Sequence, residues 1–322
     1  MLHRRRVAVL HRLLTHARYE ILPTETIEGI VADHLPLGRT LTVTASPSKG
    51  LEATLALTER LAARGYDVVP HLAARMVSGP AELSEILGRM EQAGITTVFI
   101  PAGDADPPAG PYTGALDLLE DVVGLGNPFT QIGITGYPES HPTIRDDVTI
   151  QTMWDKRRYA TQIVSNLTFD PRVLGSWVRR VRDRDVTTPI LIGLPGPVER
   201  AKLLAMATKI GVGESTKFLA KNRGVFARIA APGGYDPLRF LGRAVDALGA
   251  DDMNVLGLHV FTFNQVAVTE AWRQQQLARL ERSGDLVRDA VVTTSPSLAA
   301  GDTDAEHQRA VLRPSGASAA CP

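Results

Sequence analysis

Eight short apolar runs, separated by longer amphipathic stretches, constrain the fold of this chain more than any other feature of its sequence. Each run has the length of a β-strand, and the stretches between them repeat apolar residues at helical spacing. Strands that alternate with helices pair in parallel through right-handed crossovers. The sequence therefore predicts a (β/α)8 TIM barrel, with a doubly wound open sheet as the alternative. The predicted strands are Arg18–Leu22, Thr40–Ala45, Asp67–Leu72, Thr96–Pro101, Gln131–Tyr137, Gln162–Leu167, Pro189–Leu194 and Val255–Phe263.

Glycine residues mark the ends of two of the predicted helices. Gly65 and Gly94 stand where two of these patterns stop, and glycine is the usual residue just past a helix end. No G-x-G-x-x-G follows the first strand, which weakens the dinucleotide-binding version of the open-sheet alternative. The predicted helices are Leu51–Arg64, Ala81–Ala93, Tyr112–Leu125, Pro171–Arg184, Val198–Ile210 and Pro237–Leu248.

The two ends of the chain differ from this core. Residues 1–17 read as a short amphipathic helix beside the first strand, because the apolar stretch is broken by His11 and Arg12. Residues 18–290 form the predicted barrel. Residues 291–322 are rich in Ser, Ala, Thr, Asp, Gly and Pro, and such a segment buries too little apolar surface to offset its ordering entropy. We expect a disordered tail there.

Charge and cysteine content exclude several classes of protein. Lys+Arg and Asp+Glu are both 35, which argues against nucleic-acid binding because that needs a basic face. No apolar run has the length of a membrane span. The single cysteine, Cys321, makes no intrachain disulfide and points to a reducing cytosol. Without cysteine at the strand ends, and without a histidine motif of metal-binding spacing, no metal site is predicted.

Ionisable side chains gather where the predicted strands end, which is where a barrel carries its chemistry. Glu20 lies within an apolar strand, so desolvation suits it to act as a general acid; the alternative is a glutamate paired with an arginine across the barrel. Asp104 follows Gly103, which allows close approach of a ligand. An ionised Asp104 is suited to stabilise a developing cation, and an ordinary Asx turn is the alternative. His71 ends the third strand as a ligand contact or a packing residue.

The loop Tyr137-Pro138-Glu139-Ser140-His141-Pro142 is the most distinctive of these strand ends. Two prolines fix its backbone, and Tyr, Glu and His offer an aromatic face, an acceptor and a donor. Such a loop suits a ring system with polar edges, and a rigid self-satisfied turn is the alternative. On the second strand, Thr44 opens a loop with Lys49 before a helix N-terminus, a weak signal for phosphate.

Taken in order, these strand ends resemble the methylenetetrahydrofolate reductase family. The resemblance covers roughly residues 18–270 and rests on five motifs: Tyr19-Glu20-Ile21-Leu22-Pro23, Thr42-Val43-Thr44, Val69-Pro70-His71-Leu72, Gly103-Asp104 with its proline-rich loop, and the loop that begins at Tyr137. It implies a flavoprotein of one-carbon metabolism that reduces 5,10-methylenetetrahydrofolate to 5-methyltetrahydrofolate, with FAD and NADH or NADPH as cofactors.

The resemblance also implies roles for single residues. Glu20 matches the general acid that protonates N10 of the folate, and Asp104 matches the aspartate that favours the cationic intermediate. Asn166 falls where the family has a folate-contacting Gln, and Phe218 lies in the segment of the nicotinamide-stacking loop. The positions matched to flavin contacts are Thr44, His71, Gly103, Tyr137 and His141, with Lys156 as a replacement for a family lysine.

Two departures from the family pattern concern FAD. Ala102 stands where the family usually has Arg, and the small residues before the sixth strand are replaced around Lys156. The Arg and Lys help hold the flavin in the family, so these departures predict weak FAD binding or an altered folate reaction. The alternatives are therefore oxidation of methyltetrahydrofolate by the same barrel, and a degenerate homologue that binds folate without catalysis. A homo-oligomer is compatible with the sequence.

Overall fold

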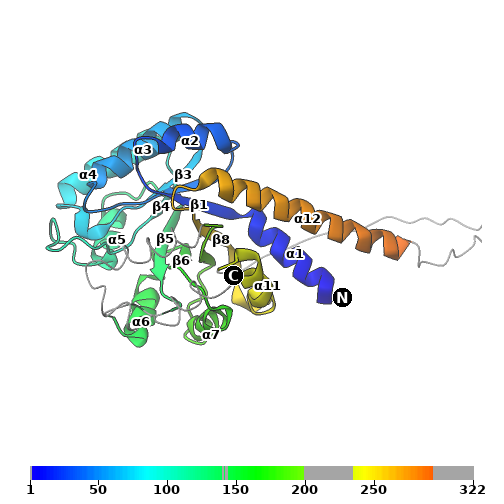
Figure 1. Cartoon of the computed structure of the whole chain (residues 1–322). Helices are drawn as coiled ribbons and strands as arrows, with labels where there is room; N and C mark the ends of the chain where they lie inside the picture. The colour runs from blue at the N-terminus through cyan, green and yellow to red at the C-terminus, as the bar shows by residue number, and fades with distance from the viewer. Residues whose placement is uncertain (1, 140, 142–143, 199–234, 293–322) are drawn as a thin grey trace, which may run out of the picture.

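The computed structural model describes residues 2–139, 141, 144–198 and 235–292, which form a near-closed barrel of parallel strands wrapped in helices (Figure 1). The strand order is β3-β2-β1-β8-β7-β6-β5-β4. Its two ends meet where His71, just after β3, forms a parallel bridge with Phe99 of β4. This contact confirms the predicted barrel over the open sheet. The strands are β1 Ala17–Ile21, β2 Thr40–Val43, β3 Asp67–Pro70, β4 Thr97–Phe99, β5 Gln131–Gly136, β6 Gln162–Ser165, β7 Ile190–Pro195 and β8 Val255–Phe261.

Each predicted strand run overlaps one observed strand, and the helices surround the barrel. Gly65 and Gly94 follow α3 and α4 with φ of 88° and 69°, as the predicted helix ends require. Within the N-terminal segment, Leu2–Thr15 form helix α1. The described helices are α1 Leu2–Thr15, α2 Ile27–His34, α3 Leu51–Ala63, α4 Pro80–Gln92, α5 Ala115–Gly124, α6 Asp146–Lys156, α7 Pro171–Arg182, α11 Pro237–Leu248 and α12 Val266–Val292.

Three of these helices were not predicted from the sequence. Helix α2 is only eight residues long, α6 has an irregular apolar pattern, and α12 follows β8 directly. The predicted helix Val198–Ile210 and the predicted tail lie largely outside the described residues. Among the described helices, none combines the length and the apolar character that crossing a membrane requires.

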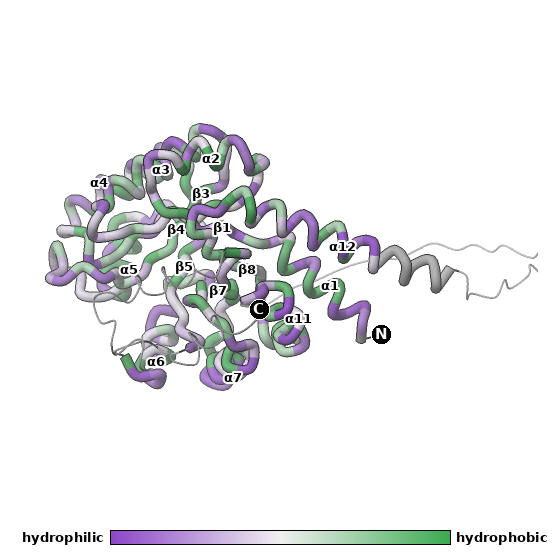
Figure 2. The backbone as a smooth tube through the Cα atoms, in the orientation of Figure 1, coloured by the Kyte–Doolittle hydropathy of each residue, from purple (hydrophilic) through white to green (hydrophobic). Residues whose placement is uncertain are grey.

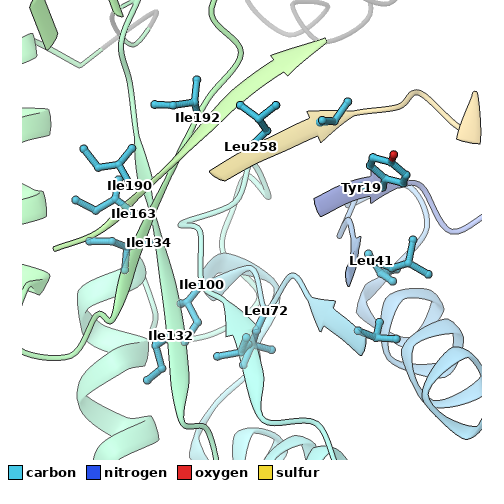
Figure 3. Close-up of a cluster of buried hydrophobic side chains, with 14 of the residues drawn as sticks. Tyr19, Leu41, Leu72, Ile100, Ile132, Ile134, Ile163, Ile190, Ile192 and Leu258 are labelled. Carbon is cyan, nitrogen blue, oxygen red and sulfur yellow. The ribbon is translucent and has the colours of Figure 1, made fainter. Parts of the chain in front are cut away.

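The main core lies between the outer faces of the strands and the helices. Alternate strand residues point outward, and Figure 3 shows such side chains on successive strands, including Leu41, Ile134, Ile163 and Leu258. The tube in Figure 2 alternates between hydrophilic and hydrophobic colour along the helices, as expected when only one face of each helix packs on the sheet. Trp177 of α7 is 1% exposed and packs so closely over Gly136 of β5 that a Cβ there would lie 2.6 Å from its ring.

The interior of the barrel is more polar than this outer core. Near the amino ends of the strands, Thr40 donates to Asp67 at 2.6 Å, and Arg18 of β1 reaches across to Gln131 of β5 at 3.4 Å. Above this layer lies a small apolar plug. Its members are Val69, Phe99, Val164 and Leu191. At the carboxyl-end rim, where the candidate site lies, Phe99 of the plug packs directly against His71.

Candidate functional site

Glu20 is the best-defined chemical group at this rim. It is the penultimate residue of β1, and the alternation that turns Tyr19 outward turns Glu20 into the barrel. Its Oε2 lies 2.9 Å from Nε2 of His259, which is 2% exposed, while the Glu20 side chain is 13% exposed. Among the described residues, the partner of Glu20 is therefore a histidine rather than the arginine that the sequence left as an alternative.

Strand β8 positions both the side chain and the backbone of Glu20. The β1–β8 register aligns Glu20 with Phe261, which sets His259 two residues lower on the neighbouring strand. The hydroxyl of Thr262 donates to the carbonyl of Glu20 at 2.6 Å. Just beyond, Asn264 bonds both backbone groups of Leu22, its Oδ1 accepting at 2.8 Å and its Nδ2 donating at 3.1 Å. The end of β1 is thus fixed in place by the end of β8.

His71 approaches the same carboxylate from the other side. Its Nε2 lies 3.8 Å from Oε2 of Glu20, beyond hydrogen-bond distance, and has no hydrogen-bond partner among the described residues. The ring packs against Phe99 with centroids 4.6 Å apart. Burial lowers the pKa of His71 from 6.5 to about 4, because the charged form loses its hydration; the Glu20 charge opposes this only in part. His71 is therefore neutral at physiological pH.

Asp104 lies on the same rim, on the loop after β4, and its side chain is exposed. Gly103 before it has φ of 83°, and a Cβ there would lie 2.8 Å from the Cβ of Ala73, so the loop needs glycine at this position. Burial raises the pKa of Tyr137, and the charge of Asp104 raises it further. Both carboxylates of the predicted pair thus lie at the carboxyl ends of their strands.

The β5–α6 loop presents an aromatic pair. The rings of Tyr137 and His141 meet edge to face with centroids 4.9 Å apart. Nδ1 of His141 accepts from the backbone N–H of Ile144 at 3.1 Å. Glu139 serves the loop itself: its Oε1 accepts from the backbone N–H of Phe169 and, at 2.8 Å, from that of Asp170. The loop therefore offers an aromatic edge to the rim, while its glutamate ties it to the next loop.

Of the remaining predicted site residues, Thr44 and Asn166 follow strand carboxyl ends, and Phe218 does not belong to the described residues. Thr44 directly follows β2, and its backbone N–H donates to the carbonyl of Ile21 at 3.0 Å. Asn166 follows β6, is exposed, and has its side-chain oxygen turned back to the N–H of Leu167 at 2.7 Å. Phe218 lies outside the described residues.

Lys156 is a correction to the predicted flavin contacts. It is the last residue of α6 and precedes β6, so it lies toward the amino ends of the strands, whereas the other site residues follow strand carboxyl ends. It is 7% exposed, and burial lowers its pKa to about 8. The structure does not bring Lys156 to the rim.

The location of Lys156 away from the rim bears on whether the site fits FAD. The aromatic pair of Tyr137 and His141 suits a flat ring, but the two cations that the resemblance assigns to the flavin are missing from the described rim. One position is Ala102, and the other is the buried Lys156. Arg75, which is close to the strand-four loop, is already bound to the carbonyl of Ala105 at 2.7 Å. The described residues therefore do not fit the family's mode of holding FAD.

Sequence reasoning missed the role of His259, although it placed this residue on the last strand. The alternation of the strand put His259 and Phe261 on one face, but the register with β1 decides which residue meets Glu20. Among the described residues, no group of three or more His, Cys, Asp or Glu side chains is arranged to hold a metal ion.

Comparison with solved structures finds distant similarity. Distant similarity is found to the crystal structure of oxaloacetate acetylhydrolase, at 12% identity over 90% of this chain and 89% of that one, with a TM-score of 0.47. A second structure of oxaloacetate acetylhydrolase, in complex with the inhibitor 3,3-difluorooxalacetate, matches at 11% identity over 77% and 97%, with a TM-score of 0.39. Neither likeness bears on the chemistry of the rim.

The family comparison is more informative. The model of the family described as "Methylenetetrahydrofolate reductase" matches residues 24–214, which is more than half of the chain. The matched range contains Asp104 and the Tyr137 loop, whereas Glu20 and His259 lie outside it and are identified by their geometry. The chain belongs to the methylenetetrahydrofolate reductase family.

Proposed function

We propose that this protein interconverts 5,10-methylenetetrahydrofolate and 5-methyltetrahydrofolate, with Glu20 as the general acid. The observation that carries the proposal is the largely buried carboxyl of Glu20, aimed into the barrel mouth and hydrogen-bonded to His259 at 2.9 Å. Family membership supplies the substrate class, a tetrahydrofolate derivative. We also expect a cytoplasmic enzyme and leave a homo-oligomer open to measurement.

In the reducing direction, the chain's own residues have two tasks. Opening the five-membered ring breaks the bond between N10 and the one-carbon unit, so N10 needs a proton and Glu20 supplies it. The one-carbon unit is then a cationic iminium at N5, and the carboxylate of Asp104 stabilises that charge electrostatically. The hydride that completes the methyl group comes from the reduced nicotinamide, NADH or NADPH, that the family uses. One proton and one hydride are consumed per turnover.

The rim residues would bind and orient the folate. The edge-to-face rings of Tyr137 and His141 offer a surface for a flat heterocycle, and Asn166 offers an amide for hydrogen bonding. Phe218 stays a proposed nicotinamide contact from the resemblance alone. Thr44, His71 and Gly103 stay proposed cofactor contacts on the same basis.

The test is turnover of Glu20→Gln beside wild type, with Glu25→Gln as the matched control. Glu25 is exposed on the loop that follows β1, so it shares the neighbourhood but not the chemistry. Methylenetetrahydrofolate is assayed with NADH or NADPH as hydride donor, and methyltetrahydrofolate with NAD⁺ or NADP⁺ as hydride acceptor, each with and without added FAD. We expect Glu20→Gln to lose about 10²–10⁴-fold in rate, the usual contribution of a general acid. Wild-type turnover by Glu20→Gln would remove this residue from the mechanism.

The same assay decides between the alternatives. Turnover only from methyltetrahydrofolate selects the oxidative direction, and folate binding without turnover under any donor selects the non-catalytic homologue. The missing cations favour a protein without tightly held flavin, which is tested by the absorbance spectrum of the purified protein. Flavin bands at one equivalent per chain would contradict that expectation.

A further inference from the structure

The carboxyl group of Glu20 has an imidazole on each of two sides, and the two contacts are unequal. Nε2 of His259 lies within hydrogen-bond distance at 2.9 Å, whereas Nε2 of His71 lies at 3.8 Å from the same oxygen. The three side chains come from β8, β1 and the end of β3, and all are nearly buried, at 2%, 13% and 11% exposure. A proton shared with Glu20 therefore has a single near partner.

His71 does not compete for this proton. Its pKa of about 4, lowered by burial, leaves it neutral across the physiological range. Its ring is packed against Phe99 on the far side. His71 thus forms an uncharged wall of the pocket, while His259, whose ring contacts Phe261 edge to face at 4.9 Å, holds the hydrogen bond.

No permanent cation neutralises Glu20 within the described residues. Arg18 lies one inward position below on β1, but its guanidinium is directed to Gln131 and lies close to Asp67. Asp104 and Tyr137 follow β4 and β5, which lie across the ring of strands from β1. A fixed arginine partner would hold Glu20 as a carboxylate, whereas a histidine can both receive and return a proton.

We propose that Glu20 and His259 act as one proton-donating pair, in which His259 is the positioning residue that stores the proton when Glu20 is ionised. This inference rests on the proposed function. The pair enters turnover with one mobile proton between Oε2 and Nε2. When N10 takes that proton from Glu20, the pair is left with an ionised carboxyl and a neutral imidazole, and one proton from solvent restores it.

The first test needs no substrate. Two-dimensional ¹H–¹⁵N spectra of the full-length, ¹⁵N-labelled protein report the protonation of each imidazole nitrogen, with His259→Gln and His71→Gln assigning the two rings. We expect Glu20→Gln to displace the His259 resonances and to change their pH dependence, while His71 stays neutral down to about pH 5. Identical His259 titrations in wild type and Glu20→Gln would overturn the inference, whether or not the enzyme reduces folate.

The second test separates proton storage from simple support. In His259→Gln the side-chain amide can still donate a hydrogen bond to Glu20 but cannot titrate, whereas His259→Leu removes both functions. We expect His259→Gln to keep KM within about threefold, to lose roughly 10–100-fold in kcat, and to change the shape of the pH–rate profile. His34→Gln, on an exposed helix end, is the control. A pH–rate profile of His259→Gln that superimposes on wild type would contradict proton storage even if His259→Leu fails to fold.

Discussion

Two glutamates on opposite sides of β1, Glu20 and Glu270, differ in how many hydrogen-bond donors surround their carboxyl groups. Tyr19 faces outward and donates to Glu270 of α12 at 2.6 Å, while the next residue, Glu20, faces into the barrel. Glu270 also accepts from Arg273 at 2.8 and 2.9 Å and from Gln274 at 2.8 Å. Glu20 has one histidine at hydrogen-bond distance. The carboxylate of Glu270 therefore accepts hydrogen bonds from three side chains, whereas the carboxyl of Glu20 has a single imidazole with which it can exchange a proton.

The pKa of Glu270 fits its structural role. Burial alone would raise that pKa, but the hydrogen bonds from Arg273 and Tyr19 outweigh it and hold the pKa below its ordinary value. Glu270 joins α12 to β1, and Arg273 extends the join to the carbonyl of Leu14 in α1. Helices α1 and α12 lie side by side in Figure 1, consistent with this contact.

We call Tyr19, Glu270, Arg273 and Gln274 the outer cluster, because their hydrogen bonds lie on the outer side of β1. The largest loss of stability is expected when this cluster is broken. Glu270→Ala leaves the guanidinium of Arg273, 9% exposed, without its carboxylate, and losing one partner of a buried ion pair costs about 3–5 kcal/mol. Urea unfolding followed by circular dichroism measures this, with Glu20→Gln as the comparison variant expected to change the free energy of unfolding by less than about 1 kcal/mol. Equal losses in both variants would erase the distinction between the two glutamates.

A pH effect of intermediate size is expected from His71 at the rim. Its folded pKa of about 4 lies below the ordinary 6.5, so between these values the unfolded chain binds a proton that the folded chain does not. Stability therefore falls as pH drops from about 6.5 to 4, by at most about 3 kcal/mol from this group. The fall should be smaller in His71→Gln, as measured by urea unfolding across this range. A fall of the same size in both proteins would show that His71 is not buried as a neutral ring.

The smallest effect is expected for Tyr19→Phe. The variant removes one hydroxyl bonded to a charged carboxylate, which costs roughly 1.5–3 kcal/mol of unfolding free energy. Since the hydroxyl lies on the outer side of β1, folate turnover should stay within about twofold of wild type. If Tyr19→Phe lost turnover without losing stability, the outer cluster would take part in the reaction, and the distinction between Glu20 and Glu270 would be wrong.

The sequence was sufficient to predict the barrel and the rim but not the partners of Glu20. Apolar runs located all eight strands because each strand buries its outer face. A carboxyl within such a run identified Glu20. The contact with His259 depends on how the last strand pairs with the first, a register set by closure of the whole barrel rather than by local pattern. Lys156 was assigned by family spacing, although its place just before a strand already indicates the amino end of the barrel.

The most direct test compares the two glutamates in one assay. Turnover of methylenetetrahydrofolate is measured for Glu20→Gln and Glu270→Gln at a temperature where circular dichroism shows both to be folded. We expect a loss of about 10²–10⁴-fold in turnover for Glu20→Gln and of less than about tenfold for Glu270→Gln. Equal rates in the two variants, or wild-type turnover by Glu20→Gln, would contradict the assignment of the inner carboxyl as the acid.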